Sequence, residues 1–275
     1  MSQIQVSAHD YNRFRDYLEK QCGIVLGENK QYLVQSRMGK VLREAAIPDF
    51  SELLNKLDTR AYGDLRQKTI DAMTTNETLW FRDVHPFEYL QNTLLPELLK
   101  EKKRLRIWCA ACSSGQEPYS ISMIIEEMLA KGQIARSVTV EILATDISSE
   151  VLESAKQGSY SRLALGRGLS PARMDTFFKK EGLDWRLVEK VRQRVKFTQI
   201  NLKDPFAGLG KFDIVFCRNV LIYFSAEFKT DILRKINGQL NPGGALFLGA
   251  SESLAGLRDI YDMHQYKPGI VYFSR

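Results

Sequence analysis

The residues best suited to chemistry follow two apolar runs in the middle of the chain. The first run, residues 105–110, leads into small residues at 109–115 and then into a sequence typical of a helix. Small side chains let a ligand approach the backbone, and Ser113 or Ser114 can cap the helix so that its free N–H groups face the ligand. The second run ends in Asp146, where doubly wound folds place a carboxylate that binds ribose hydroxyls. These residues indicate a nucleoside cofactor; an ordinary strand-to-helix turn is the alternative.

The first loop lacks the glycine patterns that hold phosphate groups. It contains neither G-x-G-x-x-G, which seats a pyrophosphate, nor G-x-x-x-x-G-K-[ST], which seats a triphosphate. Dinucleotides and ATP are therefore disfavoured as cofactors. S-adenosylmethionine contains adenosine without phosphate, so it fits this loop better.

Apolar runs recur at intervals typical of alternating strands and helices. Beyond residues 105–110 and 140–146, strands are expected at 195–202, 212–219 and 245–250, a helix near 226–240, a turn at 241–244, and a final pair of strands at 261–267 and 270–273. The run at 212–217 is almost continuously apolar, which is typical of a central parallel strand covered on both faces. The order predicts an α/β fold with a doubly wound sheet.

The first 74 residues form a separate unit by their pattern. Tyr11, Phe14 and Leu18 recur at helical spacing, and so do the apolar residues between 50 and 57. We therefore expect a helical domain at 1–74, a linker at 75–97 that contributes to the cofactor site, and a catalytic domain at 98–275. A small β-hairpin insertion is expected at about 175–193.

The second helix of this unit, about residues 30–46, has an apolar side and a basic side. Arg37, Lys40 and Arg43 spread over the arc opposite the apolar residues. A solvated surface is the plain interpretation of such a face. The formal net charge of +6 favours the alternative, a docking surface for an acidic partner.

Composition excludes several classes of protein. The chain has 275 residues and is 44% hydrophobic, but no apolar run reaches the ~18 residues of a membrane span, and its first residues do not resemble a signal peptide. Four cysteines and three histidines are too scattered for a metal site or a nucleophile–base pair, although residues 109–112 are formally C-x-x-C. Where methyltransferases of base amines carry Asn/Asp-Pro-Pro-aromatic, this chain has Arg218-Asn219-Val220-Leu221. We therefore expect a cytoplasmic protein that binds no metal and no nucleic acid.

Five motifs in one order resemble the CheR family, the glutamate methyltransferases of bacterial chemoreceptors. They are Thr75-Asn76-Glu77-Thr78-Leu79-Trp80-Phe81-Arg82, Gly115-Gln116-Glu117-Pro118-Tyr119-Ser120, Ala144-Thr145-Asp146-Ile147, Asn201-Leu202, and Cys217-Arg218-Asn219-Val220-Leu221-Ile222-Tyr223-Phe224. The resemblance runs from the N-terminal helices to the end of the chain. Residues 177–187 are shorter than the glycine-containing hairpin of many members, and this difference argues against a tethering role of the hairpin in this chain.

The resemblance implies a Rossmann-like S-adenosylmethionine-dependent methyltransferase sheet with a final antiparallel strand, a small β-hairpin subdomain and an all-helical N-terminal domain. It implies transfer of a methyl group to receptor glutamates, with S-adenosylhomocysteine as the other product. The implied partners are the cytoplasmic signalling helices of chemoreceptors, docked on Arg37, Lys40 and Arg43 of a monomer. The implied cofactor-binding residues are Asn76, Thr78, Arg82, Glu117, Asp146, Asn201, Leu202, Arg218 and Asn219.

Two of the motif residues suit the transfer step itself. Arg82 can contact the methionyl end of the cofactor or steer the incoming carboxylate, and the Tyr223 phenol can donate one hydrogen bond to it. Glu117 can accept a hydrogen bond from the ammonium group of the cofactor. A packed aromatic at Tyr223 and a linker anchor at Arg82 are the structural alternatives.

Two other functions compete with receptor methylation. One is a small-molecule carboxyl or hydroxyl methyltransferase, which would not need the basic helical domain. The other is a non-catalytic adaptor that binds the cofactor as a sensor.

Overall fold

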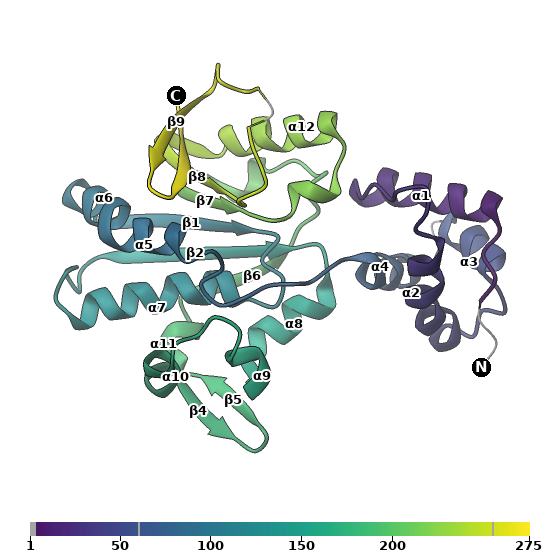
Figure 1. Cartoon of the computed structure of the whole chain (residues 1–275), viewed down its shortest axis with the longest axis horizontal. Coiled ribbons are helices and arrows are strands. Elements are labelled where there is room, and N and C mark those ends of the chain that lie inside the picture. The colour runs from purple at the N-terminus through teal and green to yellow at the C-terminus, as the bar shows by residue number, and fades with distance from the viewer. Residues whose placement is uncertain (1–3, 60, 255) are drawn as a thin grey trace.

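Two lobes of unequal size make up the part of the chain that the computed structural model describes, residues 4–59, 61–254 and 256–275 (Figure 1). The smaller lobe consists of α1 (Ala8–Cys22), α2 (Gln31–Glu44), α3 (Phe50–Leu57) and α4 (Gly63–Met73). Ser7 and Asp49 cap α1 and α3, because each side chain accepts a hydrogen bond from a backbone N–H in the first turn. Phe14, Leu18 and Leu53 are fully buried between the helices. The predicted all-helical unit is confirmed.

The larger lobe is built on a seven-stranded sheet in the order β6-β2-β1-β7-β8-β10-β9. Its strands are β1 (Arg104–Ala110), β2 (Thr139–Asp146), β6 (Val195–Gln199), β7 (Phe212–Cys217), β8 (Leu240–Leu248), β9 (Tyr261–Tyr266) and β10 (Gly269–Ser274). The pairs from β6 to β8 are parallel, whereas β10 runs antiparallel to both β8 and β9. Every residue of β7 is buried, as expected of a central strand. The predicted doubly wound sheet with an antiparallel final strand is confirmed.

Helices cover both faces of this sheet (Figure 1). One face packs on α5 (His85–Tyr89), the π-helical turn η1 (Leu90–Leu94), α6 (Leu95–Glu101), α7 (Gln116–Ala130) and α8 (Ser149–Gln157); the other packs on α12 (Ala226–Asn237). Alternate strand residues face the two sides, so Ile107 belongs to the first core and Trp108 to the second. Part of the segment expected as a linker, residues 75–97, is therefore helical and packs on the sheet.

A second, three-stranded sheet in the order β3-β5-β4 lies below the main sheet in Figure 1. It comprises β3 (Ser159–Ser161), β4 (Phe178–Glu181) and β5 (Asp184–Leu187), accompanied by α9 (Arg162–Leu165), α10 (Pro171–Phe177) and α11 (Glu189–Arg192). The predicted hairpin is β4–β5, which turns at Gly182. The subdomain also includes β3, so it begins before residue 175.

Two local expectations differ from the structure. The turn expected at residues 241–244 does not precede the strand but lies inside β8 as a bulge, where Gly243 has φ 69° and the register opposite β7 shifts. The third strand, β6, ends at Gln199, so Asn201 and Leu202 lie in the loop that follows. Two short 3-10 turns complete the lobe, η2 (Ala207–Leu209) and η3 (Leu221–Tyr223).

The end of α1 packs against the larger lobe. Gly23 ends the helix with φ 77°, and a Cβ on it would lie 2.1 Å from the Phe228 ring of α12. The segment after α1 also contacts the larger lobe, because the Val25 N–H donates a hydrogen bond to the Tyr223 carbonyl (2.9 Å). Only glycine satisfies both the left-handed backbone and the close approach of the ring.

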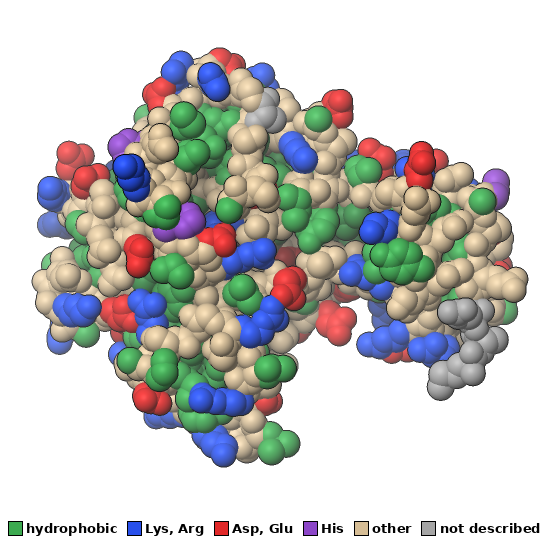
Figure 2. All heavy atoms as spheres, in the orientation of Figure 1, with side chains coloured by type: hydrophobic (Ala, Val, Ile, Leu, Met, Phe, Trp, Pro, Cys, Tyr) green, Lys and Arg blue, Asp and Glu red, His purple; other side chains and the backbone are tan. Residues whose placement is uncertain are grey.

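On the opposite side of the junction, α4 contacts the start of α8. Gln67 Nε2 donates to the Ile147 carbonyl (3.0 Å), and Ser149 Oγ donates to Asp71 (3.0 Å). Figure 2 shows the surface hollowed between the helical lobe and the three-stranded subdomain, with Lys and Arg side chains gathered on the helical side. Within the described ranges, no helix has the length and hydrophobicity needed to cross a membrane.

Candidate functional site

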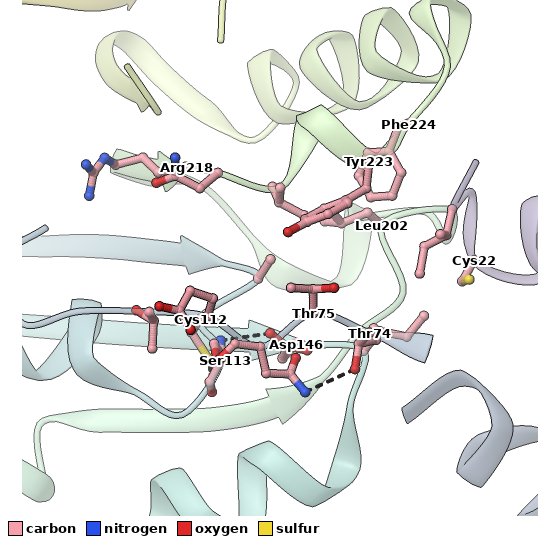
Figure 3. Close-up of a pocket in the computed structure, with 18 of the residues that line it drawn as sticks. Cys22, Thr74, Thr75, Cys112, Ser113, Asp146, Leu202, Arg218, Tyr223 and Phe224 are labelled. Carbon is pink, nitrogen blue, oxygen red and sulfur yellow. Dashed lines mark hydrogen bonds between the residues drawn. The ribbon is translucent and has the colours of Figure 1, made fainter. Parts of the chain in front are cut away.

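A pocket lies at the carboxyl ends of β1, β2 and β7, where the helical lobe and the connecting segment between α4 and α5, residues 74–84, close over it (Figure 3). All nine predicted cofactor-binding residues line this pocket, together with Tyr223: Asn76, Thr78, Arg82, Glu117, Asp146, Asn201, Leu202, Arg218 and Asn219. Cys22, Ile24 and Met73 contribute from the helical lobe. A pocket at this edge of a doubly wound sheet is where such folds bind ligands.

The loop from β1 to α7 approaches the pocket through its backbone. Ala111 and Ser113 have positive φ angles of 58° and 50°, so the chain is sharply folded there. The expectation that Ser113 or Ser114 caps α7 was wrong. Gly115 holds the cap position with φ 91° and no side chain caps the helix, while the serine hydroxyls donate to the Asn76 carbonyl and to Gln116. The first N–H groups of α7 therefore lack a side-chain cap.

Asp146 ends β2 and holds the loop from β1. One carboxylate oxygen accepts from the Ser113 N–H (2.8 Å) and the other from the Ser148 N–H (3.0 Å). Burial raises the pKa of Asp146, and these two hydrogen bonds oppose that shift. Each carboxylate oxygen has a second lone pair, so the side chain retains acceptor capacity for hydroxyl groups in the pocket.

Glu117 and Arg218 form a buried ion pair. Arg218 Nη1 lies 3.0 Å from the Glu117 carboxylate, and Nη2 donates to Asp83 (2.6 Å) and to the Arg82 carbonyl (3.0 Å). The Arg218 side chain is 1% exposed, and Figure 3 shows its guanidinium pointing away from Tyr223. Burial raises the pKa of Glu117, and Arg218 opposes the shift. These two predicted cofactor residues thus bind each other and the segment that carries Arg82.

Arg82 and Tyr223 come from different segments of the pocket wall. Arg82 is half-buried in a loop in which Phe81, Asp83 and Val84 all have positive φ angles, a conformation that non-glycine residues adopt at some cost. Tyr223 ends η3, and Figure 3 shows its hydroxyl directed into the pocket. The structure brings both predicted transfer residues to one cavity.

Asn201 and Leu202 lie in the loop after β6. Asn201 Nδ2 donates to the Gln21 carbonyl at the end of α1 (2.7 Å), and its Oδ1 accepts from the Lys203 N–H (3.0 Å). Its amide therefore joins the two lobes. Leu202 is buried, and Ile147 and Ile200 add further apolar surface to the pocket, which suits the face of an adenine ring.

Comparison with known families decides the nature of this site. The model of the CheR methyltransferase SAM binding domain matches residues 76–270, and that of the CheR methyltransferase all-alpha domain matches residues 9–74. The chain belongs to the CheR family. "Chemotaxis protein methyltransferase 1" of Pseudomonas aeruginosa is 55% identical over 97% of this chain and 98% of its own. "Chemotaxis protein methyltransferase" of Vibrio parahaemolyticus is 50% identical over 99% of each chain.

S-adenosylmethionine is the cofactor of this CheR protein, and the pocket fits it. The Ser113 N–H is already bound to Asp146, so it is not free to hold a phosphate group. The lining also combines two buried carboxylates, Asp146 and Glu117, with apolar residues, and the guanidinium of Arg218 is already paired with Glu117 and Asp83, which matches a nucleoside without phosphate. Asp146 would hold the ribose, and Ile147, Ile200 and Leu202 would contact the base.

The cysteines near the CheR pocket are neutral thiols. Burial raises the pKa of Cys109 and of Cys112 well above the usual range, so neither is a thiolate at neutral pH. Cys112 lines the pocket as a small apolar side chain. The described part of the chain contains no group of three or more His, Cys, Asp or Glu placed to hold a metal ion.

The basic helix of the CheR protein differs from its predicted pattern. Arg37 is half-buried and donates to the carbonyls of Met73 (2.7 Å) and Thr74 (3.0 Å), whereas Lys40 and Arg43 are exposed. Arg37 therefore fixes the start of the connecting segment, which a helical wheel cannot reveal because the bond is to a distant backbone. The exposed basic side of α2 is defined by Lys40 and Arg43.

Sequence reasoning missed Glu252, which accepts four backbone hydrogen bonds beside the pocket. It lies in an irregular segment after β8 that contains no apolar periodicity. No local pattern could have identified it.

Proposed function

We propose that this CheR protein transfers the methyl group of S-adenosylmethionine to glutamate side chains of chemoreceptors and forms glutamate methyl esters. The observation that carries the proposal is the joint placement of Asp146, Arg82 and Tyr223 in one pocket. Asp146 suits the ribose of the cofactor, and the other two side chains suit an incoming carboxylate. Relatives that span nearly the whole chain are named for chemotaxis methyltransferase activity.

Methyl transfer to a carboxylate requires the protein to position the cofactor and the acceptor, and it requires no proton transfer. When bound, the cofactor supplies a methyl group on a positively charged sulfur. A glutamate side chain has a reference pKa of about 4.3, so it is already ionised at neutral pH and needs no general base. The protein must align the carboxylate and exclude water. None of the described residues that line the pocket is a histidine.

Arg82 and Tyr223 can orient the acceptor without binding it too tightly. Arg82 is half-buried and bonded only loosely to the Glu77 carbonyl (3.4 Å), so its guanidinium can turn toward a carboxylate. The Tyr223 phenol can donate one neutral hydrogen bond. Strong pairing would stabilise the ground state more than the transition state, so modest donors favour turnover.

The acceptor is an acidic helical segment of the receptor's cytoplasmic domain. Lys40 and Arg43 on α2 and the net charge of +6 would attract such a surface and speed association. We infer that the protein acts as a monomer in the cytoplasm, where these helices lie. A small-molecule acceptor would make no use of the basic helical lobe, and an adaptor would make no use of Arg82 and Tyr223.

Transfer of radiolabelled methyl groups tests the proposal against both alternatives. Purified protein and labelled S-adenosylmethionine are incubated with a receptor cytoplasmic fragment, with small carboxylic acids, or with no acceptor. The proposal predicts label in the receptor fragment that mild alkali releases as methanol. Label only in small acids would favour the small-molecule enzyme, and cofactor binding without turnover would favour the adaptor.

A further inference from the structure

Glu252 binds the backbone of two segments at once. Its Oε2 accepts from the N–H groups of Asn219 and Gly249 (both 2.7 Å), and its Oε1 accepts from those of Val220 (3.0 Å) and Leu221 (2.7 Å). Both oxygens are thus fully used. The carboxylate joins the end of β7 to the end of β8, beside the pocket wall formed by Asn219 and Val220.

Three consecutive N–H groups converge on this carboxylate. Asn219 has φ 59°, and this left-handed residue turns the chain from β7 into η3. Successive N–H groups in such a turn form a concavity that binds anions. In this chain the anion is internal, because the Glu252 side chain fills the concavity. Without it, the N–H groups at the start of η3 lose their acceptor.

The approach of Glu252 requires a glycine on the neighbouring strand end. A Cβ on Gly249 would lie 2.7 Å from Glu252 Oε2, 2.8 Å from Asn219 Nδ2 and 2.9 Å from the Asn219 nitrogen. These distances are too short for a real side chain. The hydrogen bonds of Glu252 to Asn219 and Gly249 therefore depend on glycine at position 249.

We propose that Glu252 is a positioning residue for methyl transfer, which holds residues 219–223 so that Tyr223 faces the pocket. Tyr223 follows Leu221 by two residues in the same turn, and its N–H donates to the Val220 carbonyl (3.2 Å). Movement of the bound N–H groups would therefore move the phenol. The kinetic part of this proposal rests on the proposed function; its structural part does not.

Hydrogen exchange of the ligand-free protein tests the structural part. Glu252→Gln keeps the size of the side chain but replaces one acceptor oxygen with an NH2 group, which cannot accept from the two N–H groups it would face. We expect amide exchange at residues 219–221 to accelerate by about tenfold or more. Glu227→Gln, an exposed change in the first turn of α12, is the matched control. Unchanged protection of residues 219–221 in Glu252→Gln would overturn the proposal.

A double-mutant cycle with Tyr223→Phe tests the kinetic part at saturating cofactor. We expect Glu252→Gln to lower kcat by about tenfold with a smaller change in receptor KM. If Glu252 acts through Tyr223, the double variant should turn over about as slowly as the slower single variant. Multiplicative losses, or normal kcat in either folded single variant, would contradict the assignment. Should Glu252→Gln not fold, Glu252→Asp, which keeps the charge but shortens the reach, replaces it with the same expectations.

Calorimetry with S-adenosylhomocysteine tests the role of Glu252 separately from the proposed methylation of receptors. Because Asn219 and Val220 line the pocket, we expect Glu252→Gln to bind this product about tenfold more weakly than the wild type. Equal affinity in a folded variant would contradict a role for Glu252 in the pocket wall. A wild type that binds the product but methylates no receptor would refute the proposed function and leave this comparison valid.

Discussion

Asp146 can both hold backbone N–H groups and line the pocket, because a carboxylate has more acceptor sites than two hydrogen bonds use. It holds the Ser113 and Ser148 N–H groups and still faces the pocket. Its position after an apolar strand could be predicted from the sequence. The two backbone bonds could not, because they depend on how the loop from β1 folds back on β2. The sequence likewise predicts that Glu117 and Arg218 line the pocket. It does not predict that they pair with each other, because they are 101 residues apart in the chain.

Replacement of Asp146 should weaken cofactor binding. We expect Asp146→Ala to lower the affinity for S-adenosylhomocysteine by about 1.5–3 kcal/mol, the scale of lost hydrogen bonds to a charged group. Isothermal calorimetry measures the effect. Asp213→Asn is a matched control, because Asp213 is a buried carboxylate near the opposite end of β7 that binds Lys102 and Asn241. It should lose stability but keep its affinity; unchanged affinity in folded Asp146→Ala would remove Asp146 from the site.

Breaking the Glu117–Arg218 ion pair should make the free energy of unfolding depend on pH. An acid whose folded-state pKa is raised contributes stability at low pH and loses it as the pH rises through that pKa. Burial raises the pKa of Glu117 and Arg218 opposes the shift, so Arg218→Met should raise this pKa further. We expect a loss of about 3–5 kcal/mol at neutral pH, because a charge stays buried without a partner. The deficit should shrink as the pH falls toward about 4.3, the unfolded-state value.

Urea unfolding between about pH 5 and pH 8 measures this dependence. The double variant Glu117→Gln/Arg218→Met has no buried carboxylate at this position. Its stability relative to wild type should therefore vary little with pH over the same range. A deficit in Arg218→Met that is equally large at every pH would contradict the assignment of the buried charge to Glu117.

At the scale of elements, hydrophobic pattern was sufficient for the regular parts of the fold. The apolar runs predicted the five parallel strands and the closing pair because burial on both faces leaves a continuous signal. Pattern failed where the backbone departs from regularity. Residues 241–244 form a bulge inside β8 rather than a turn before it. The strand β3 is three residues long and pairs with β5, which lies 23 residues or more further along the chain. Neither feature has a local hydrophobic signature.

The junction between α1 and α12 should tolerate no side chain at Gly23. Its φ is 77°, and the Phe228 ring lies 2.1 Å from where a Cβ would be. We expect Gly23→Ala to lower the free energy of unfolding by about 2–4 kcal/mol, from backbone strain plus overpacking. Gly132→Ala is the matched control, because Gly132 has φ 68° with nothing within 4 Å of the added Cβ. It should cost about 1 kcal/mol. Equal losses in urea unfolding would mean that the ring moves aside freely.

At the scale of the whole molecule, two lobes enclose the pocket and one of them presents the basic helix. The lobes could be predicted from the break in pattern near residue 74. The way the two lobes contact each other could not be predicted, because the contacts are isolated hydrogen bonds, such as those from Asn201 to Gln21 and from Val25 to Tyr223. These bonds place α1 against the wall that carries Tyr223. The exposed basic side of α2 and the pocket that contains Tyr223 therefore lie on lobes that contact each other through these hydrogen bonds.

Charge reversal on α2 should slow receptor association without affecting the cofactor. We expect Lys40→Glu/Arg43→Glu to raise the receptor KM several-fold at low salt, and to do so less as the Debye length shrinks from ~10 Å toward ~3 Å. Arg37 is left intact because it holds the Met73 and Thr74 carbonyls. Lys131→Glu/Arg136→Glu, at and beyond the far end of α7, makes the same change in net charge and serves as the control. Equal effects of both pairs would indicate a general charge effect rather than docking.

The site of the methyl group on the acceptor tests the central claim most directly. A receptor cytoplasmic fragment is methylated by the purified protein and mapped by tandem mass spectrometry before and after mild alkali. We predict methyl groups on glutamate side chains of helical segments, lost after alkali and absent when those glutamates are replaced by alanine. Methyl groups that resist alkali, or that lie on lysine, cysteine or a terminal group, would contradict transfer to a carboxylate held by Arg82 and Tyr223.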